Sequence, residues 1–387
     1  RRLEAALGGA QAVADITGSR AYERFTGNQI AKVYRKQPEA YERTERIALV
    51  SAFIAGLLAG RNAPIDYSDG SGMNLLDIRA RQWSPAALDA VAPDLAPRLG
   101  APAASHETIG TVHPYYVHRY GFDRQTLVVA CSGDNPNSLA GLRLQEAGDI
   151  AVSLGTSDTL FGSLAVPRPS GREGHIFVNP VDPKLFMGMI VHQNGSLTRQ
   201  RVRDAAVGAD WDAFAAAVAS VPVGNDGRVG VYVHEPEITP RISRTGEFRF
   251  DESNRPAEAF EPAAEARAVL ESQCLSLRLH AVGLGLEPRT IYATGGASVN
   301  PALIRILADV FGAPVYTGEQ PNSAALGAAY RALHGFRCAR SGGFIAFAEA
   351  VTGASPFTKA AATDPAAHAV YDRLLERFAS LEVSLSD

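Results

Sequence analysis

The chain has 387 residues, of which 46% are hydrophobic and 20% charged, so it can form about two domains with a sizeable core. Its net charge of −4 includes no basic block, which argues against a nucleic-acid or membrane-surface partner. No apolar run reaches the ~20 residues that a membrane span needs. The three cysteines, Cys131, Cys274 and Cys338, have no disulfide or metal-binding spacing, so we expect a cytoplasmic protein.

The first third of the chain has mostly helical spacing of its apolar residues. This spacing predicts helices over residues 3–14 and 38–60. Another helix is expected to begin at Pro85, because Ser84 is a good N-cap and proline is favoured at the first helical position. These helices come before the polar segments that are candidates for chemistry.

A polar loop, residues 16–32, follows the first predicted helix. Arg20 and Arg24 lie there between turn residues and ahead of another helical segment. Guanidinium groups donate several hydrogen bonds, so these arginines could bind the oxygens of a polyol. A solvated surface position is an equally good interpretation, and position alone leaves both open.

Residues 64–78 alternate aspartate with serine and glycine. The pattern suggests a calcium loop or a second acidic site, but the ligand spacing and the terminal glutamate of a calcium loop are absent. We interpret this stretch as a structural turn held by hydrogen bonds from its aspartates.

Residues 127–141 contain the first strong motif. Leu127–Ala130 is a short apolar run that predicts a buried strand, and Gly133-Asp134-Asn135 follows it in a turn that leads to a helix. Ligands of open α/β sheets bind at such strand ends, so Asp134 stands where a reacting group could be. Aspartate after a strand is more often a helix cap, which is the alternative here.

Residues 149–161 predict two strands joined at Gly155-Thr156-Ser157. Small residues in such a turn let backbone N–H groups and hydroxyls approach a phosphate. The same three residues also fit an ordinary hairpin turn.

Residues 290–311 form a strand, a Gly295-Gly296 turn and a helix that begins at Asn300. Glycines there allow the backbone to approach a base or a phosphate. A dinucleotide-binding fingerprint is excluded, because the third glycine and the acidic partner are missing. Trp211 begins another helix; its side chain either packs in the core or is exposed and packs against a nucleotide base.

Together these motifs resemble the FGGY family of carbohydrate kinases. The resemblance rests on Gly133-Asp134-Asn135, on Ser153-Leu154-Gly155-Thr156-Ser157, and on the strand, glycine turn and helix near the carboxyl end, and it extends from Ile16 to the last helix. It implies an α/β fold with two RNase H-like, actin-like ATPase domains around a cleft. We expect residues 1–122 to belong to the first, sugar-side domain and residues 123–387 to the second, nucleotide-side domain.

Within the family, the chain is most similar to members that phosphorylate D-xylulose. The resemblance implies transfer of the γ-phosphoryl group of ATP, accompanied by Mg²⁺, to give D-xylulose 5-phosphate. It is compatible with a homodimer and does not identify the metal ligands. It gives Asp134 the role of general base and sugar ligand, and adds Arg24 and Asn135 as further sugar ligands. For ATP it implies Gly155, Thr156 and Ser157 near the phosphates and Trp211, Gly295, Gly296 and Asn300 around the adenosine.

The chain departs from the family pattern in one respect. Members begin with a strand and an Asp-x-Gly-Thr phosphate hairpin, and no such motif occurs here. We therefore expect an incomplete first domain and no sugar phosphorylation by residues 1–387 alone. Two alternatives remain: a family member that acts on ribulose, glycerol or gluconate, and a non-catalytic sugar-binding module on the same fold.

Overall fold

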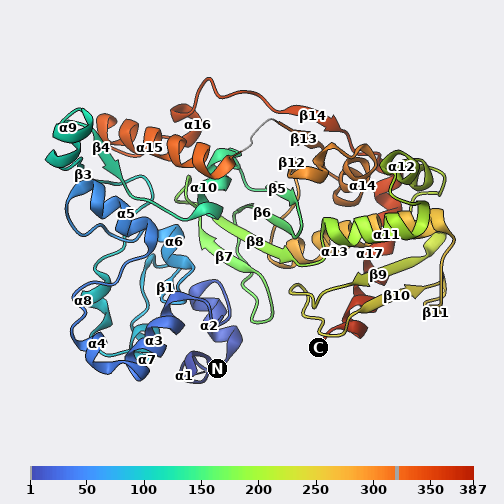
Figure 1. Cartoon of the computed structure of the whole chain (residues 1–387), viewed down its shortest axis with the longest axis horizontal. Coiled ribbons are helices and arrows are strands. Elements are labelled where there is room, and N and C mark those ends of the chain that lie inside the picture. The colour runs from blue at the N-terminus through green and yellow to red at the C-terminus, as the bar shows by residue number, and fades with distance from the viewer. Residues whose placement is uncertain (1, 319–321) are drawn as a thin grey trace. The chain divides into compact units, whose positions relative to one another are not determined.

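The computed structural model describes residues 2–318 and 322–387 and divides into two compact units (Figure 1). The first unit consists of Arg1–Glu146, Ser163–Gly188 and Gln320–Ser355, and the second of Ala147–Gly162, Met189–Glu319 and Pro356–Asp387. The boundary expected near residue 122 falls inside the first unit. The assignment of family domains to residues 1–122 and 123–387 stays a prediction.

Two of the predicted amino-terminal helices are interrupted. The segment 3–14 forms α1 (Arg2–Leu7) and α2 (Ala10–Thr17), because Gly8 and Gly9 between them have φ of 95° and 120°, outside helical geometry. The segment 38–60 forms α4 (Pro38–Glu42) and α5 (Val50–Ala59). The backbone N–H of Ile47 bonds to Arg98 O at 2.9 Å, so a tertiary contact replaces the helical bond there.

The first unit contains further short helices and strands. Helix α7 (Pro85–Val91) has the predicted cap, because Ser84 accepts a hydrogen bond from the Ala87 N–H. The other elements are α3 (Thr26–Lys36), α6 (Tyr67–Ser71), α8 (Leu95–Leu99), α9 (Pro114–Tyr120), α10 (Asp134–Gly141), α15 (Ser323–Ser341), α16 (Phe347–Ala350), β1 (Leu76–Asp77), β2 (Gln82–Trp83), β3 (Thr108–Thr111), β4 (Leu127–Val129) and β7 (His175–Val178).

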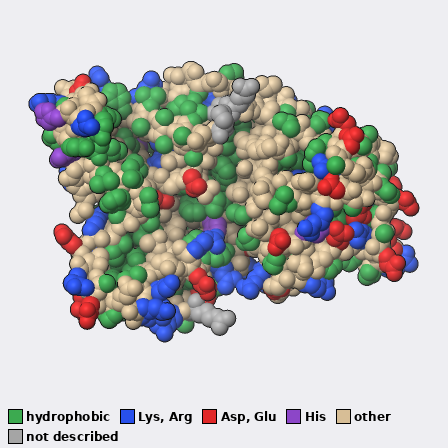
Figure 2. Space-filling model, in the orientation of Figure 1, with side chains coloured by type: hydrophobic (Ala, Val, Ile, Leu, Met, Phe, Trp, Pro, Cys, Tyr) green, Lys and Arg blue, Asp and Glu red, His purple; other side chains and the backbone are tan. Residues whose placement is uncertain are grey.

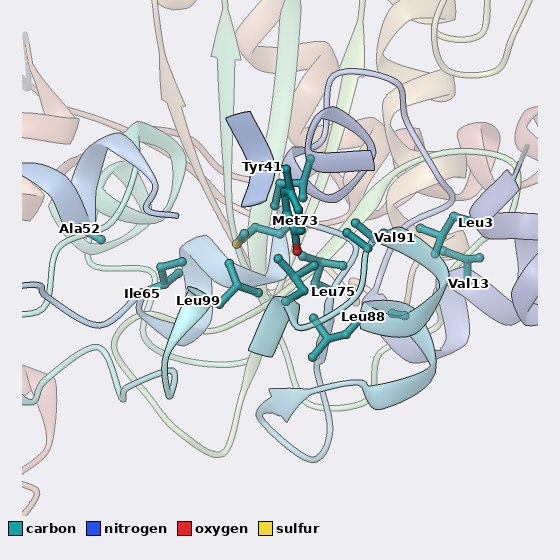
Figure 3. Close-up of a cluster of buried hydrophobic side chains, with 14 residues drawn as sticks. Leu3, Val13, Tyr41, Ala52, Ile65, Met73, Leu75, Leu88, Val91 and Leu99 are labelled. Carbon is teal, nitrogen blue, oxygen red and sulfur yellow. The ribbon is translucent and has the colours of Figure 1, made fainter. Parts of the chain in front are cut away.

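A hydrophobic core holds these amino-terminal helices together (Figure 3). Leu75, Leu99 and Met73 are fully buried in it, and Leu3 and Val13 join it from the first two helices. Burial of a large aliphatic side chain contributes roughly 1.5–3 kcal/mol, so this cluster accounts for the packing of short helices that would not be stable alone.

Helix α5 has apolar side chains on its outer face as well. Val50 is 79% exposed and Phe53 57% exposed, and Ile54 and Leu57 are also about half exposed. Hydrophobic side chains gather over α5 and α9 at the left of the space-filling view (Figure 2).

Helices α10 and α15 pack with their backbones in contact. A Cβ built on Gly327 would lie 1.7 Å from Asn137 O, and one on Gly141 would lie 2.0 Å from Ser323 O. The small residues around Gly327 thus support the helix that begins with Asp134.

Six strands of a seven-stranded mixed sheet belong wholly or in part to the second unit, in the order β14-β13-β12-β5-β6-β8. Strand β12 runs parallel to both β5 and β13, while β6 pairs antiparallel with β5 and β14 antiparallel with β13. The predicted hairpin over 149–161 is therefore present. The strands are β5 (Asp149–Leu154), β6 (Asp158–Leu164), β8 (Phe186–His192), β12 (Thr290–Thr294), β13 (Val315–Thr317) and β14 (Thr358–Ala361).

The 22-residue helix α13 (Pro262–Gly283) is buried along most of its length. The other helices of this unit are α11 (Ser196–Val207), α12 (Trp211–Ala219), α14 (Pro301–Phe311), α17 (Pro365–Leu385) and the 3₁₀ turns η1 (Asn225–Gly227) and η2 (Gly296–Val299). A small antiparallel sheet of β9 (Val229–Val233), β10 (Gly246–Phe250) and β11 (Pro256–Ala257) completes it. Among the described residues, no helix is long and apolar enough to cross a membrane.

Candidate active site

A pocket of about 620 Å³ in the second unit gathers most of the residues expected to bind a nucleotide. Gly155 and Thr156 line it from the turn between β5 and β6, and Gly296 and Asn300 line it from the segment between β12 and α14. Trp211 lines it from the start of α12. Residues far apart in the sequence therefore meet at one cavity.

The start of α11 holds the hairpin turn from behind. The Ser196 N–H donates to Gly155 O at 2.8 Å, and the Gly195 N–H donates to Thr156 O at 3.2 Å. A Cβ on Gly195 would lie only 2.6 Å from Thr156 O, so this contact requires glycine. The positive end of the α11 dipole thus faces the turn, an arrangement that favours a nearby anion.

A buried ion pair fixes the far end of the same turn. Arg199 on α11 binds both carboxylate oxygens of Asp158, at 2.6 and 3.0 Å, and also donates to Gln273 Oε1 at 2.8 Å. Burial raises the pKa of the Asp158 carboxyl, and the Arg199 guanidinium opposes that rise. A buried pair costs desolvation energy, so we assign it to fixing geometry rather than to net stability.

Trp211 presents an open aromatic face at the pocket. Its side chain is 43% exposed, and the guanidinium carbon of Arg203 lies 4.3 Å from its ring centroid. Asp210 caps α12 by accepting from the N–H groups of Asp212 and Ala213, which sets the position of the tryptophan at the first helical residue. A flat base could stack on such a ring.

The glycine turn after β12 is packed tightly against the hairpin. Gly295 has φ of 84°, and a Cβ there would lie 2.7 Å from Leu154 O, whereas a Cβ on Gly296 would meet nothing within 4 Å. Asn300 caps α14 by accepting from the N–H groups of Ala302 and Leu303. Asn300 therefore both lines the pocket and caps a helix.

In the first unit, Asp134 is the first residue of α10 and its side chain is exposed. One carboxylate oxygen accepts a hydrogen bond from the Asn135 N–H at 2.8 Å, and Asn135 is half-buried. The helix begins at Asp134 itself, within the segment that the sequence predicts as a turn. Its carboxylate keeps acceptor capacity for an outside hydroxyl.

The loop ahead of Asp134 is held by a buried network. Arg331 on α15 donates to Asp66 Oδ2 at 2.9 Å and to Asn137 Oδ1 at 2.7 Å, and the Ser132 hydroxyl donates to the same Asp66 oxygen at 2.5 Å. The Asn137 amide donates to Ser132 O at 3.1 Å. Asp66 thereby holds the loop at Ser132, and Arg331 holds the start of α10 at Asn137.

The sequence interpretation of residues 64–78 as a structural turn holds for Asp66, which caps α6 by accepting from the Asp69 N–H at 2.8 Å. It overlooks Asp69. Burial, together with the charge of Asp66, raises the pKa of the Asp69 carboxyl to about 6. The alternation of aspartate with small residues drew attention to this segment, but it could not show that the Asp69 carboxyl is buried.

Arg24 is exposed and lies beside a buried histidine. One of its guanidinium nitrogens is 3.4 Å from His175 Nε2, and its carbon is 4.9 Å from the Tyr22 ring centroid. Burial, and then the Arg24 charge, lowers the pKa of His175 to about 3. Since a guanidinium only donates, Nε2 is the acceptor, and Nδ1–H then donates to Ser19 Oγ at 3.1 Å.

The structure therefore groups the predicted residues in two sets. Arg24, Asp134 and Asn135 belong to the first unit, and the seven nucleotide candidates belong to the second. Two of the nucleotide candidates, Ser157 and Gly295, do not line the pocket and lie in the turns next to residues that do. Within residues 2–318 and 322–387, no group of three or more His, Cys, Asp or Glu side chains forms a metal site.

Comparison with known proteins supplies the family. Residues 1–141 match the FGGY family of carbohydrate kinases, N-terminal domain, and residues 150–336 match the C-terminal domain of the same family. The chain is 53% identical over 384 residues to a mouse xylulose kinase, covering 98% of this chain and 68% of that protein. It is 46% identical over 358 residues to Arabidopsis thaliana xylulose kinase 2, covering 89% and 64%.

Solved structures share the fold. Xylulose kinase from Rhodospirillum rubrum has a TM-score of 0.81 at 21% identity, over 97% of this chain and 75% of that one. Plasmodium falciparum glycerol kinase with ADP has a TM-score of 0.76 at 14% identity, over 100% and 78%. These matches confirm the predicted α/β fold of actin-like ATPase type, and on the sequence evidence the chain belongs to the FGGY family of carbohydrate kinases.

Proposed function

We propose that the protein transfers the γ-phosphoryl group of ATP to a hydroxyl of D-xylulose, with Asp134 as the general base. The relatives in mouse and Arabidopsis that match it are xylulose kinases, which favours this sugar within the family. A xylulose hydroxyl is a weak nucleophile, so a carboxylate within hydrogen-bond reach would accept its proton as the O–P bond forms.

The observation that carries the proposal is the pocket of the second unit. Five of the seven residues expected to contact ATP line it, and they come from three separate parts of the chain. The hairpin turn at Gly155 and Thr156 would hold the phosphates, and Trp211 would stack on the base. Mg²⁺ would arrive with ATP and neutralise phosphate charge; the chain's own part is to bind and orient the nucleotide.

Arg24 and Asn135 would select the sugar. Arg24 has guanidinium N–H groups left beyond the one near His175, and Asn135 has a half-buried side-chain amide. Hydrogen bonds to a neutral polyol contribute roughly 0.5–1.5 kcal/mol each, and charged ones roughly 1.5–3 kcal/mol. Several such bonds are needed to distinguish sugars that differ at one hydroxyl.

An ADP-release assay with the purified full-length protein tests the proposal on a panel of D-xylulose, D-ribulose, glycerol and D-gluconate. We expect the highest kcat/KM for D-xylulose, and sugar-dependent ADP release slower by ~10²–10⁴-fold in Asp134→Asn. A higher value for another acceptor would reassign the substrate. Tight sugar binding without turnover by the wild-type protein would favour the non-catalytic alternative.

A further inference from the structure

We propose that Asp69 is a positioning residue for this reaction: its carboxylate holds the backbone of Gly133 and thereby fixes Asp134, the next residue. The inference rests on the proposed function, because Asp69 would affect the reaction only by positioning Asp134, the proposed general base. Asp69 itself is not assigned to contact the sugar or ATP.

The contact geometry carries the inference. Asp69 lies on α6, where the Ser51 hydroxyl of α5 donates to its carboxylate, and the backbone N–H of Gly133 faces the same carboxylate and lowers its pKa. A Cβ built on Gly133 would lie 3.1 Å from Asp69 Oδ1, so the absence of a side chain lets the carboxylate approach this closely. Gly133 is the N-cap of α10, whose first residue is Asp134.

No neighbouring cation pairs directly with the negative charge of the Asp69 carboxylate in the described part of the chain. Arg331 directs its nitrogens to Asp66, Asn137 and the Ser105 carbonyl, so its guanidinium is largely used by the network that holds the loop. The other charged or titratable groups facing Asp69 are Asp66, which raises its pKa, and Cys131. Among the described residues, Asp69 has no ion pair within 4 Å.

A carboxylate in such surroundings is an expensive hydrogen-bond acceptor. A neutral asparagine could accept from Ser51 and Gly133 without placing a second negative charge beside Asp66. The ionised form makes the stronger, charge-assisted bond to the Gly133 N–H, which fixes the loop more firmly. Perturbed carboxylates of this kind cluster at functional positions.

The test compares Asp69→Asn with Ser51→Ala across pH 5 to 9. The wild-type kcat is expected to fall on the acid side near pH 6, as Asp69 takes up a proton. Ser51→Ala removes a donor that lowers the pKa, so the acid limb should move to higher pH. Asp69→Asn should abolish the limb and reduce the plateau kcat about tenfold, while the KM for D-xylulose changes less than about threefold.

Asp77→Asn is the matched control, because Asp77 lies in the same segment and accepts from the N–H groups of Arg79 and Ala80. It should leave both kcat and the acid limb unchanged. Unchanged kcat and pH profile in Asp69→Asn, at wild-type melting temperature, would overturn the proposal.

A readout independent of turnover separates this inference from the proposed function. The Gly133 amide, followed by NMR with ¹⁵N-glycine, should titrate near pH 6 in the wild type, at higher pH in Ser51→Ala, and not at all in Asp69→Asn. A Gly133 amide that is insensitive to pH would refute the contact. A titrating amide in a protein that phosphorylates no sugar would instead refute the proposed function, and with it the part of Asp69 in catalysis.

Discussion

Asp134 is the first residue of helix α10, and its exposed carboxylate accepts a hydrogen bond from the Asn135 N–H. Asp134→Asn keeps the shape and one acceptor oxygen but removes the basic group. General-base catalysis typically supplies ~10²–10⁴-fold, so kcat should fall by that order. Calorimetric affinity for D-xylulose and the melting temperature should change little.

A purely structural Asp134 would give the opposite pattern. The sequence left open a helix cap at this position, but in the structure Gly133 is the N-cap and Asp134 is the first helical residue, where a carboxylate stabilises the helix dipole by roughly 0.3–1 kcal/mol. A lowered melting temperature with kcat within about threefold of wild type would therefore assign Asp134 to stabilising the start of α10. Glu39→Gln, in the first turn of α4, is a control for the stability change expected from such a charge alone.

His175 gives a prediction for stability against pH. An unfolded histidine takes up a proton near pH 6.5, whereas burial keeps the folded one neutral down to about pH 3. Unfolding therefore binds a proton between these values, and stability falls as pH decreases below 6.5, by at most ~1.4 kcal/mol per pH unit. Asp69 acts in the opposite sense: its raised pKa makes stability fall as pH rises from about 4 to 6.

His175→Gln should consequently flatten the loss of stability between pH 6.5 and 5. The measurement is the melting temperature of the variant and the wild type at several pH values, and the slope rather than the level is compared, because the variant also loses ring packing. His118→Gln, exposed on α9, should keep the wild-type slope. An unchanged slope in His175→Gln would mean that this histidine is protonated in the folded protein.

Local sequence motifs pointed to Asp134 and the hairpin, and the family resemblance added Arg24. They could not point to His175, which lies 151 residues from Arg24 and is adjacent to it only in the folded unit. Asp69 was visible in the sequence, but its raised pKa depends on the burial of α6 and on the use of Arg331 by Asp66.

For helices and strands, the sequence patterns predicted the type of each element better than the residues at which it begins and ends. The hairpin of β5 and β6, the strand β12 and the starts of helices α7 and α14 lie where the sequence places them. Helix α5 is shorter than predicted, because apolar spacing cannot show that Ile47 bonds to Arg98 instead of continuing a helix. Local signals are overridden where distant backbone offers a partner.

The turn after β12 makes an element-scale prediction. Gly295→Ala forces a left-handed φ of 84° on alanine, which costs ~1–2 kcal/mol, and drives its Cβ to 2.7 Å from Leu154 O. The turn should move away from the hairpin, so ADP affinity should fall at least about tenfold and the melting temperature should drop by several degrees.

Gly296→Ala is the stability control for that change. Its Cβ would meet open space, and its backbone is not in the left-handed region, so the melting temperature should match the wild type. If Gly295→Ala bound ADP with wild-type affinity, the glycine turn would not shape the nucleotide pocket.

For the whole molecule, the candidate residues divide between the two units. The sugar candidates Arg24, Asp134 and Asn135 lie in the first, and the pocket with Trp211 lies in the second. Family likeness accounts for both sets, but composition and periodicity alone would have given only an α/β protein of two domains.

This division predicts that local substitutions separate the two ligands. The chain has two tryptophans, Trp83 in the first unit and Trp211 at the pocket, so ADP should change the fluorescence of Trp211 alone. The change should persist in Trp83→Phe and disappear in Trp211→Phe. Arg24→Ala should weaken D-xylulose binding by about tenfold or more, since a charged hydrogen bond is lost, and leave the ADP titration unchanged.

Gly295→Ala should give the reverse result, with weaker ADP binding and unchanged affinity for D-xylulose measured by calorimetry. Arg20→Ala, on the same polar loop as Arg24 but paired at 3.7 Å with Glu4, is the matched control and should change neither affinity. Equal losses of both ligands in Arg24→Ala, at wild-type melting temperature, would contradict a local sugar role for Arg24, because an effect confined to one site cannot weaken the other without coupling between them.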